Sequence, residues 1–247
     1  MNLEKLTQFR KDLEELHIVL SDLQLEQFYI YYEMLVEKNK VMNLTAITEF
    51  DEVMKKHFVD SLSLVKVCDL NGSLSVIDVG TGAGFPGLPL KIAFPDLKVT
   101  LLDSLQKRVG FLQEVIDKLK LQDIVTVHGR AEDFAKPDQM RETFDLCVSR
   151  AVANLSVLSE YCLPYVKVGG KFISYKSDKV KVESEGNKTE ISEAEHAISV
   201  LGGKLAQQEE FMLPSSDIYR NLVVIEKSRP TPKQYPRKAG TASKKPL

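Results

Sequence analysis

The sequence predicts an α/β fold, a mostly parallel sheet with helices on both faces, preceded by a cap of helices. From Gly72 onward, short apolar runs rich in β-branched residues alternate with segments of helical pattern, and this order implies right-handed crossovers between parallel strands. Before Asn71 the apolar residues recur at helical spacing without a strand pattern. We therefore divide the chain into a helical cap (1–70), an α/β domain (71–228) and a basic, proline-containing tail (229–247).

The cap is expected to hold three amphipathic helices, over Leu3–Val19, over Asp22–Lys38 and from Thr48 to about Val67. Ser21 followed by Gln24 has the spacing of a capping box, in which two side chains satisfy free N–H groups at the start of a helix. Thr48 followed by Asp51 has the same spacing and predicts the start of the third helix.

The α/β domain is expected to hold seven strands, over Leu74–Val79, Val99–Asp103, Ile124–His128, Phe144–Ser149, Lys171–Tyr175, Leu205–Leu213 and Asn221–Lys227. Helices are expected over Leu88–Phe94, Gln106–Leu119 and Leu155–Tyr165. Only residues 214–220 separate the last two strands, which is too short for a crossover helix, so this pair should be antiparallel. The tail, with prolines at four positions, is expected to run extended along the surface without regular structure.

Composition places the chain among ordinary soluble globular proteins, with 43% hydrophobic and 28% charged residues in 247. The three cysteines, Cys68, Cys147 and Cys162, are widely spaced and fit neither a disulfide framework nor a metal site. No apolar stretch is long enough for a signal peptide or a membrane span. We therefore expect a cytoplasmic protein, monomeric and without metal.

The charge is unevenly distributed along the chain. The residues from Lys227 to the end hold seven of the 33 basic side chains and no acidic ones, which leaves 26 basic against 35 acidic residues elsewhere. A basic tail on an acidic body favours a polyanionic partner such as RNA. The alternative is a solvated terminal tail.

The first strand of the α/β domain runs directly into Gly-Thr-Gly-Ala-Gly at positions 80–84. The dinucleotide-binding fingerprint has glycine at the first, third and sixth positions of such a loop, whereas here the sixth position is Phe85. A P-loop would need a lysine and a hydroxyl residue, which are absent. The spacing instead resembles motif I of the Rossmann-like class I methyltransferases, whose cofactor S-adenosylmethionine lies across the carboxyl ends of the strands. Gly80 and Gly82 are the loop's candidate cofactor contacts.

Polar residues follow the other strands at the same edge of the sheet. Asp103 ends the second strand, 23 residues after Gly80, where a carboxylate would accept hydrogen bonds from ribose hydroxyls or would cap the next helix. Ala131 and Glu132 follow the third strand, where their backbone would border the adenine or form an acidic turn that starts a short helix. Arg150 ends the fourth strand, and its partner is a cofactor carboxylate, nucleic acid or a structural acid.

Several longer runs occur in order along nearly the whole chain: NLTAI (43–47), HFVDS (57–61), DVGTGAGFPGLPL (78–90), RAE (130–132), SRAV (149–152) and YPRKAGT (235–241). With these runs the chain resembles the bacterial 16S rRNA guanine-N7 methyltransferase family, RsmG or GidB. The resemblance implies methyl transfer from S-adenosylmethionine to N7 of one guanine in 16S rRNA, free or in the 30S subunit. It implies cofactor contacts at Gly80, Phe85, Ala131, Glu132 and Arg150. The chain departs from the family at Ser177, where glycine is usual after Lys176, and at Ala242, where proline is common.

This chemistry needs few catalytic groups, because guanine N7 carries a free lone pair and no base must remove a proton. Arg150 is the single candidate catalytic residue, and His57 is expected to pack or to hydrogen-bond rather than act as acid or base. The candidate RNA contacts are Asn39, Asn43, Lys176, Arg220, Arg237 and Lys238. Three alternatives stay open: the same fold acting on another RNA or a small molecule, a non-enzymatic RNA-binding or division-associated protein with a vestigial loop, and an NAD-dependent oxidoreductase, which Phe85 disfavours.

Overall fold

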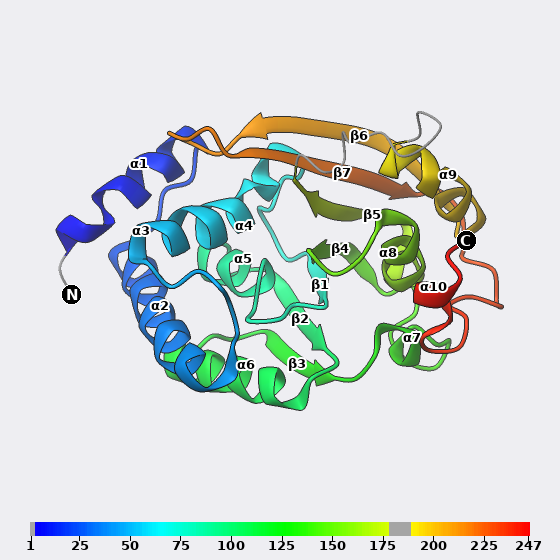
Figure 1. Cartoon of the computed structure of the whole chain (residues 1–247), viewed down its shortest axis with the longest axis horizontal. Coiled ribbons are helices and arrows are strands. Elements are labelled where there is room, and N and C mark those ends of the chain that lie inside the picture. Colours follow the sequence, from blue (N-terminus) through cyan, green and yellow to red (C-terminus); the bar gives the residue numbers. More distant parts are fainter. Residues whose placement is uncertain (1–2, 178–188) are drawn as a thin grey trace.

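A seven-stranded sheet organises the molecule, in the strand order β3-β2-β1-β4-β5-β7-β6 (Figure 1). The computed structural model describes residues 3–177 and 189–247. The strands are β1 (Ser75–Val79), β2 (Lys98–Asp103), β3 (Ile124–His128), β4 (Phe144–Arg150), β5 (Val166–Lys176), β6 (Gly203–Met212) and β7 (Tyr219–Lys227). β1 to β5 are mutually parallel, whereas β7 runs antiparallel between β5 and β6. The predicted mostly parallel sheet with an antiparallel last pair is confirmed.

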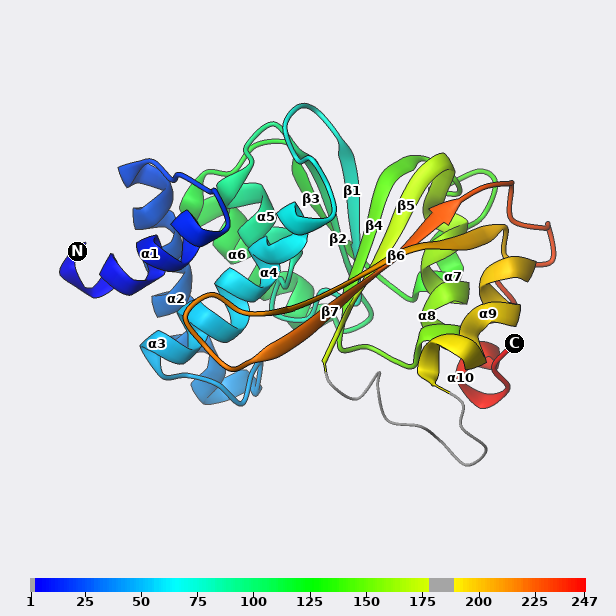
Figure 2. The ribbon, with the colours of Figure 1, turned by 90° about the horizontal axis from the view of Figure 1, so that it is seen from above.

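Helices cover both faces of the sheet (Figure 2). One face carries α5 (Gly87–Ala93), α6 (Gln106–Leu119) and the cap, and the other carries α7 (Ala131–Phe134), α8 (Leu155–Cys162), α9 (Glu190–Val200) and α10 (Thr241–Lys244). A 3-10 turn, η4 (Leu163–Tyr165), extends α8 to the predicted end of that segment. Two buried clusters of apolar side chains, one on each face, form the core. The sequence did not predict α9.

The cap consists of η1 (Leu3–Leu6), α1 (Thr7–Glu15), α2 (Asp22–Met42), α3 (Phe50–Val53), η2 (Met54–Val59), α4 (Asp60–Leu62) and η3 (Ser63–Lys66). The capping box of Ser21 and Gln24 at the start of α2 is confirmed. The predicted cap at Thr48 is wrong. The N-cap of α3 is Glu49, without a side-chain cap, and the carbonyl of Thr48 instead accepts a hydrogen bond from the Tyr32 hydroxyl at 3.2 Å. The predicted third helix is also interrupted by the π-helical turn η2.

The cap shares its hydrophobic core with the sheet, because buried cap residues such as Phe9 and Phe58 belong to the same cluster as Val76 and Val148. Tyr31 of α2 is buried, and its hydroxyl donates a 2.5 Å hydrogen bond to the carbonyl of Ala83 in the glycine loop. The cap therefore supports the glycine loop directly.

The tail differs from its prediction. It contains the short helix α10, and Thr231 and Ala242 within it are buried. The guanidinium of Arg141 donates 2.6 Å hydrogen bonds to the carbonyls of Thr231 and Tyr235. The expectation of a tail without regular structure is wrong, because side chains of the α/β domain satisfy the tail's backbone groups and the tail packs on the domain.

Candidate cofactor and substrate site

The glycine loop begins where β1 ends and is held by the neighbouring strands. Gly80 has φ +73°, and its N–H donates to the carbonyl of Leu102 at 2.8 Å. A Cβ at this position would lie 2.6 Å from Cγ2 of Val152. Both the backbone conformation and the lack of space therefore require glycine at position 80.

Asp78 is buried in β1, two residues before the glycine loop, and its carboxylate fixes the conformation of the loop. Its Oδ2 accepts hydrogen bonds from the Thr81 hydroxyl at 2.6 Å and from the Gly87 N–H at 2.8 Å. Burial raises the pKa of Asp78 to about 6, because removal from water disfavours the charged form. Its Oδ1 is buried and has no hydrogen-bond partner.

Asp103 connects the ends of β1 and β2. Its Oδ2 accepts from the N–H of Gly82 and its Oδ1 from the N–H of Leu105, both at 2.9 Å. Arg108 lies 3.6 Å from Oδ2. A carboxylate has about four lone-pair sites, so Asp103 keeps acceptor capacity for ribose hydroxyls. The Asp103 carboxylate can therefore support the local backbone and contact a ligand at the same time.

A cavity of about 320 Å³ opens at the carboxyl ends of β1, β2 and β3, a size at the lower end of the roughly 300–1,000 Å³ of small-molecule sites. It is lined by Val79, Gly80, Leu102, Asp103, Ser104, Gly129, Arg130, Ala131, Glu132, Val152, Tyr161, Gly240 and Ser243. Four predicted cofactor residues, Gly80, Asp103, Ala131 and Glu132, thus come together in one cavity. Sequence reasoning missed Tyr161, Gly240 and Ser243, which no local motif connects to the glycine loop.

Phe85 and Arg150, also predicted as cofactor contacts, do not line this cavity, and neither does Gly82. Phe85 is buried under the cap, where its ring stacks on His57 with centroids 4.5 Å apart. The guanidinium of Arg150 lies 4.9 Å from the centre of the same ring. These residues form a second group at the carboxyl edge of the sheet, between β4 and the cap.

Asp60 is the centre of this second group. Its buried carboxylate accepts from Nη1 of Arg150 at 2.9 Å and from Nε of Arg220 at 2.8 Å. One carboxylate therefore pairs with two guanidinium groups. The sequence allows three partners for Arg150: a cofactor carboxylate, nucleic acid or a structural acid. The structure shows the last of these, Asp60.

His57 is neutral within this group. Burial, and after it the charge of Arg150, lowers the pKa of His57 to about 3. Its Nε2 lies 2.8 Å from the Thr45 hydroxyl, and its Nδ1 lies 3.5 Å from Nη2 of Arg150. The expected packing and hydrogen-bonding role of His57 agrees with this geometry.

The candidate RNA contacts are spread over several elements. The Oδ1 of Asn39 accepts the N–H of Thr45 at 2.9 Å, and Asn43 ends α2 in the left-handed conformation, with φ +49°. Lys176 pairs with Glu190 at 2.6 Å. Arg237 forms a bidentate pair with the buried Glu160, with N–O distances of 2.6 to 3.0 Å.

Lys238, in contrast, is exposed, as are Lys233, Lys244 and Lys245 of the tail. Arg237 therefore anchors the tail to the body, while exposed lysines remain on the tail's surface. Among residues 3–177 and 189–247, no group of three or more His, Cys, Asp or Glu side chains is arranged to hold a metal ion. None of the helices in these ranges is both long and apolar enough to cross a bilayer.

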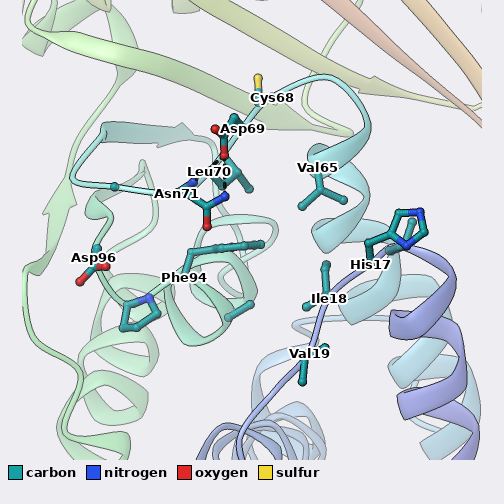
Figure 3. Close-up of a pocket in the computed structure, with 14 residues that line it drawn as sticks. His17, Ile18, Val19, Val65, Cys68, Asp69, Leu70, Asn71, Phe94 and Asp96 are labelled. Atoms are coloured by element: carbon teal, nitrogen blue, oxygen red, sulfur yellow. Dashed lines mark hydrogen bonds between the residues drawn. The ribbon is translucent and has the colours of Figure 1, made fainter.

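A larger cavity of about 590 Å³ lies between the cap and the opposite edge of the sheet (Figure 3). His17, Ile18 and Val19 from the cap face Asn71 and Phe94 across it. It borders the segments that precede β1 and β2, whereas ligands of open α/β sheets bind at the carboxyl ends of the strands. No predicted site residue lines it.

Solved structures define the class of the fold. A methyltransferase from Pyrococcus furiosus matches with a TM-score of 0.55 at 16% identity, over 80% of this chain and 95% of that chain. A SAM dependent methyltransferase from Aquifex aeolicus matches with a TM-score of 0.53 at 18% identity, over 74% and 96%. The fold is that of the Rossmann-like S-adenosylmethionine-dependent methyltransferases.

Sequence relatives define the family. The family model described as GidB, rRNA small subunit methyltransferase G, matches residues 24–212. A ribosomal RNA small subunit methyltransferase G from Lachnoclostridium phytofermentans is 54% identical over 239 residues, covering 97% of this chain and 96% of that protein. The chain belongs to the GidB family.

Proposed function

We propose that this protein transfers a methyl group from S-adenosylmethionine to N7 of a guanine in the 16S rRNA of the small ribosomal subunit. The observation that carries the proposal is the cavity at the carboxyl ends of β1 to β3, in a chain of the GidB family. The name of its 54% identical relative supports a ribosomal RNA substrate. The choice of guanine N7 rests on the resemblance of the sequence motifs.

The residues at the cavity fit the cofactor. Gly80 lines the cavity at the end of β1, and Asp103 keeps acceptor sites for ribose hydroxyls. Ala131 and Glu132 line the same cavity, where their backbone would border the adenine. Phe85 and Arg150 would act from the neighbouring group, beside the place where the methyl acceptor would enter.

The reaction needs alignment more than proton transfer. The bound cofactor supplies an electrophilic methyl group, and guanine N7 already carries a lone pair at neutral pH. The protein's task is therefore to hold the base in line and to exclude water, which by positioning alone is worth several orders of magnitude in rate. A neutral His57, with a pKa of about 3, suits a role in holding Arg150 and Phe85 rather than in acid–base chemistry.

The RNA would lie along the carboxyl edge, near Asn39, Asn43, Lys176, Arg220 and the exposed Lys238 of the tail. Arg220 and Lys176 are cationic residues at this edge that are each paired with an acid, and phosphate oxygens are further acceptors suited to such groups. We propose a monomer acting on 16S rRNA, either free or within a 30S particle.

The test measures binding and transfer separately. Calorimetry with S-adenosylmethionine should show binding to the wild-type protein and its loss in Gly80→Arg, since the new side chain would collide with Val152. Gly169→Arg is the matched control, because Gly169 also has positive φ, +88°, but a Cβ added there would meet nothing within 4 Å and the residue is outside the cavity. No binding by the wild type, or equal binding by Gly80→Arg, would contradict the proposal.

Transfer of a tritiated methyl group onto 30S subunits from cells lacking this protein then identifies the acceptor. Label at a single N7-methylguanine, mapped by cleavage at that base, is the expected result. Label on another base or atom, or transfer only to small molecules or other RNA, would refute the acceptor assignment while leaving the cofactor assignment intact.

A further inference from the structure

The C-terminal part of the tail is fixed against the α/β domain by one buried ion pair. The carboxylate of Glu160, on α8, is 1% exposed and accepts from the backbone N–H of Arg237 at 2.8 Å as well as from its guanidinium. This pairing raises the pKa of Arg237 above its ordinary value. A buried carboxylate without a partner is strongly destabilising, so the pair holds residue 237 firmly in place.

The chain then reaches the cavity. Gly240, with φ +79°, donates its N–H to Oε1 of Glu132 at 2.8 Å. Glu132 is itself buried and lines the cavity, so a residue of the tail directs the carboxylate of a cofactor-site residue. A hydrogen bond between a backbone N–H and a buried carboxylate is charge-assisted and of the stronger kind.

Helix α10 completes the arrangement. Ala242 is 1% exposed and turns toward the body of the protein, and α10 lies beside α7 and α8 (Figure 1). Ser243 and Gly240 line the cavity together with Gly80 and Asp103 of the strand ends, and the Ser243 hydroxyl interacts with that of Tyr161. Residues 237–244, which we name the C-terminal clasp, thus contribute one wall of the cavity.

We propose that the C-terminal clasp is part of the cofactor site: it closes the side of the cavity that the strand ends leave open and positions Glu132 for the ligand. This inference rests on the proposed function, since S-adenosylmethionine is the ligand that the cavity would hold. Gly240 and Ser243 are then binding-site residues, and Arg237 is a positioning residue. The exposed lysines nearby have a different role, in contacting RNA.

The first test displaces α10 in the full-length protein. Ala242→Asp introduces a charge at a buried position and should expel α10 from its contacts, whereas Lys204→Ala makes the same change in net charge at an exposed position of β6, outside the clasp and the cavity. Calorimetry with S-adenosylmethionine should give a Kd at least tenfold higher for Ala242→Asp and within twofold of wild type for Lys204→Ala. Circular dichroism checks that both variants are folded.

A Kd for folded Ala242→Asp within twofold of the wild-type value would overturn the clasp inference while leaving the proposed function standing. Absence of binding by the wild-type protein would overturn both. These two failures are distinguishable in the same set of titrations.

The second test uses the unaltered protein and does not depend on any variant folding. Hydrogen exchange should show the amides of residues 237–244 at least tenfold better protected at saturating S-adenosylmethionine than without it, because a wall of the site is stabilised by its ligand. An exposed loop outside this cavity, residues 71–73, serves as the internal reference. Unchanged exchange of the clasp on saturation would overturn the inference.

Discussion

At the scale of single residues, Phe85 joins the glycine loop to the cap. It occupies the loop position that rules out the dinucleotide fingerprint, and its buried ring contacts His57 and Tyr31 of the cap and the guanidinium of Arg150. The family resemblance implied a cofactor contact for Phe85, while the structure gives it a place between loop and cap. Its role toward the cofactor stays a prediction.

His57 gives a test of this residue group through pH. Its folded-state pKa of about 3 lies below the unfolded value of 6.5, so its contribution to stability is present above pH 6.5 and is lost as pH falls toward 3. Between pH 6.5 and 5, the free energy of unfolding of the wild-type protein should fall by about 1 to 2 kcal/mol more than that of His57→Gln. Urea unfolding at a series of pH values measures this difference.

Asp78 also makes the free energy of unfolding depend on pH, but it does so in the wild type and in His57→Gln alike. Its pKa is raised to about 6 in the fold, above the ordinary 3.8, so its contribution has the opposite sign: it is present below pH 3.8 and is lost as pH rises through 6. Because both proteins contain Asp78, the difference between them isolates His57. Parallel pH curves for wild type and His57→Gln would show that the imidazole is not held neutral.

At the scale of elements, most strands were predictable because they are apolar runs rich in β-branched residues, bounded by turn residues. The predicted ranges for β3 and α6 match the structure, and the other predicted strands differ mainly at their ends. The π-helical turn in the cap and the helix α10 could not be predicted, since neither has a distinctive local pattern. The partnership of Arg150 with Asp60 was equally hidden, because the two residues lie 90 positions apart.

The glycine loop supplies a prediction at this scale. Gly80 and Gly82 both have positive φ, +73° and +63°, but a Cβ at Gly80 would meet Val152 at 2.6 Å, whereas at Gly82 the nearest atom is 4.0 Å away. Each alanine substitution should cost about 1 kcal/mol of backbone strain, and Gly80→Ala should cost more than Gly82→Ala, because the Val152 side chain must also move. Chemical denaturation of both variants checks the order, and equal losses would contradict it.

At the scale of the whole molecule, the cap and the tail are both built into the α/β domain, on opposite faces of the sheet (Figure 2). The sequence predicted three segments by charge and periodicity, but it could not reveal that buried acids such as Glu160 and Glu132 receive partners from the tail. Removal of residues 229–247, the obvious test for RNA binding, would also expose Glu160 and open the cavity. Neutralising Lys233, Lys238, Lys244 and Lys245 tests the RNA role without this complication.

The ion pair itself can be tested by a double substitution. Arg237→Met should destabilise the protein by about 3 kcal/mol or more, because it leaves the buried carboxylate of Glu160 unpaired. Adding Glu160→Gln removes that charge and should recover at least half of the loss. Thermal and urea unfolding of both single variants and the double variant provide the measurement, and purely additive losses would argue against the pair.

The position of the clasp also has a consequence for biogenesis. Gly240 and Ser243 follow every other residue of the cavity in the sequence, and chains fold from the N-terminus while they are synthesised. The glycine loop and the strands can therefore assemble while one wall of the cavity is still missing. A nascent or prematurely terminated chain would hold its cofactor poorly, so full ligand affinity would signal that synthesis has passed the clasp.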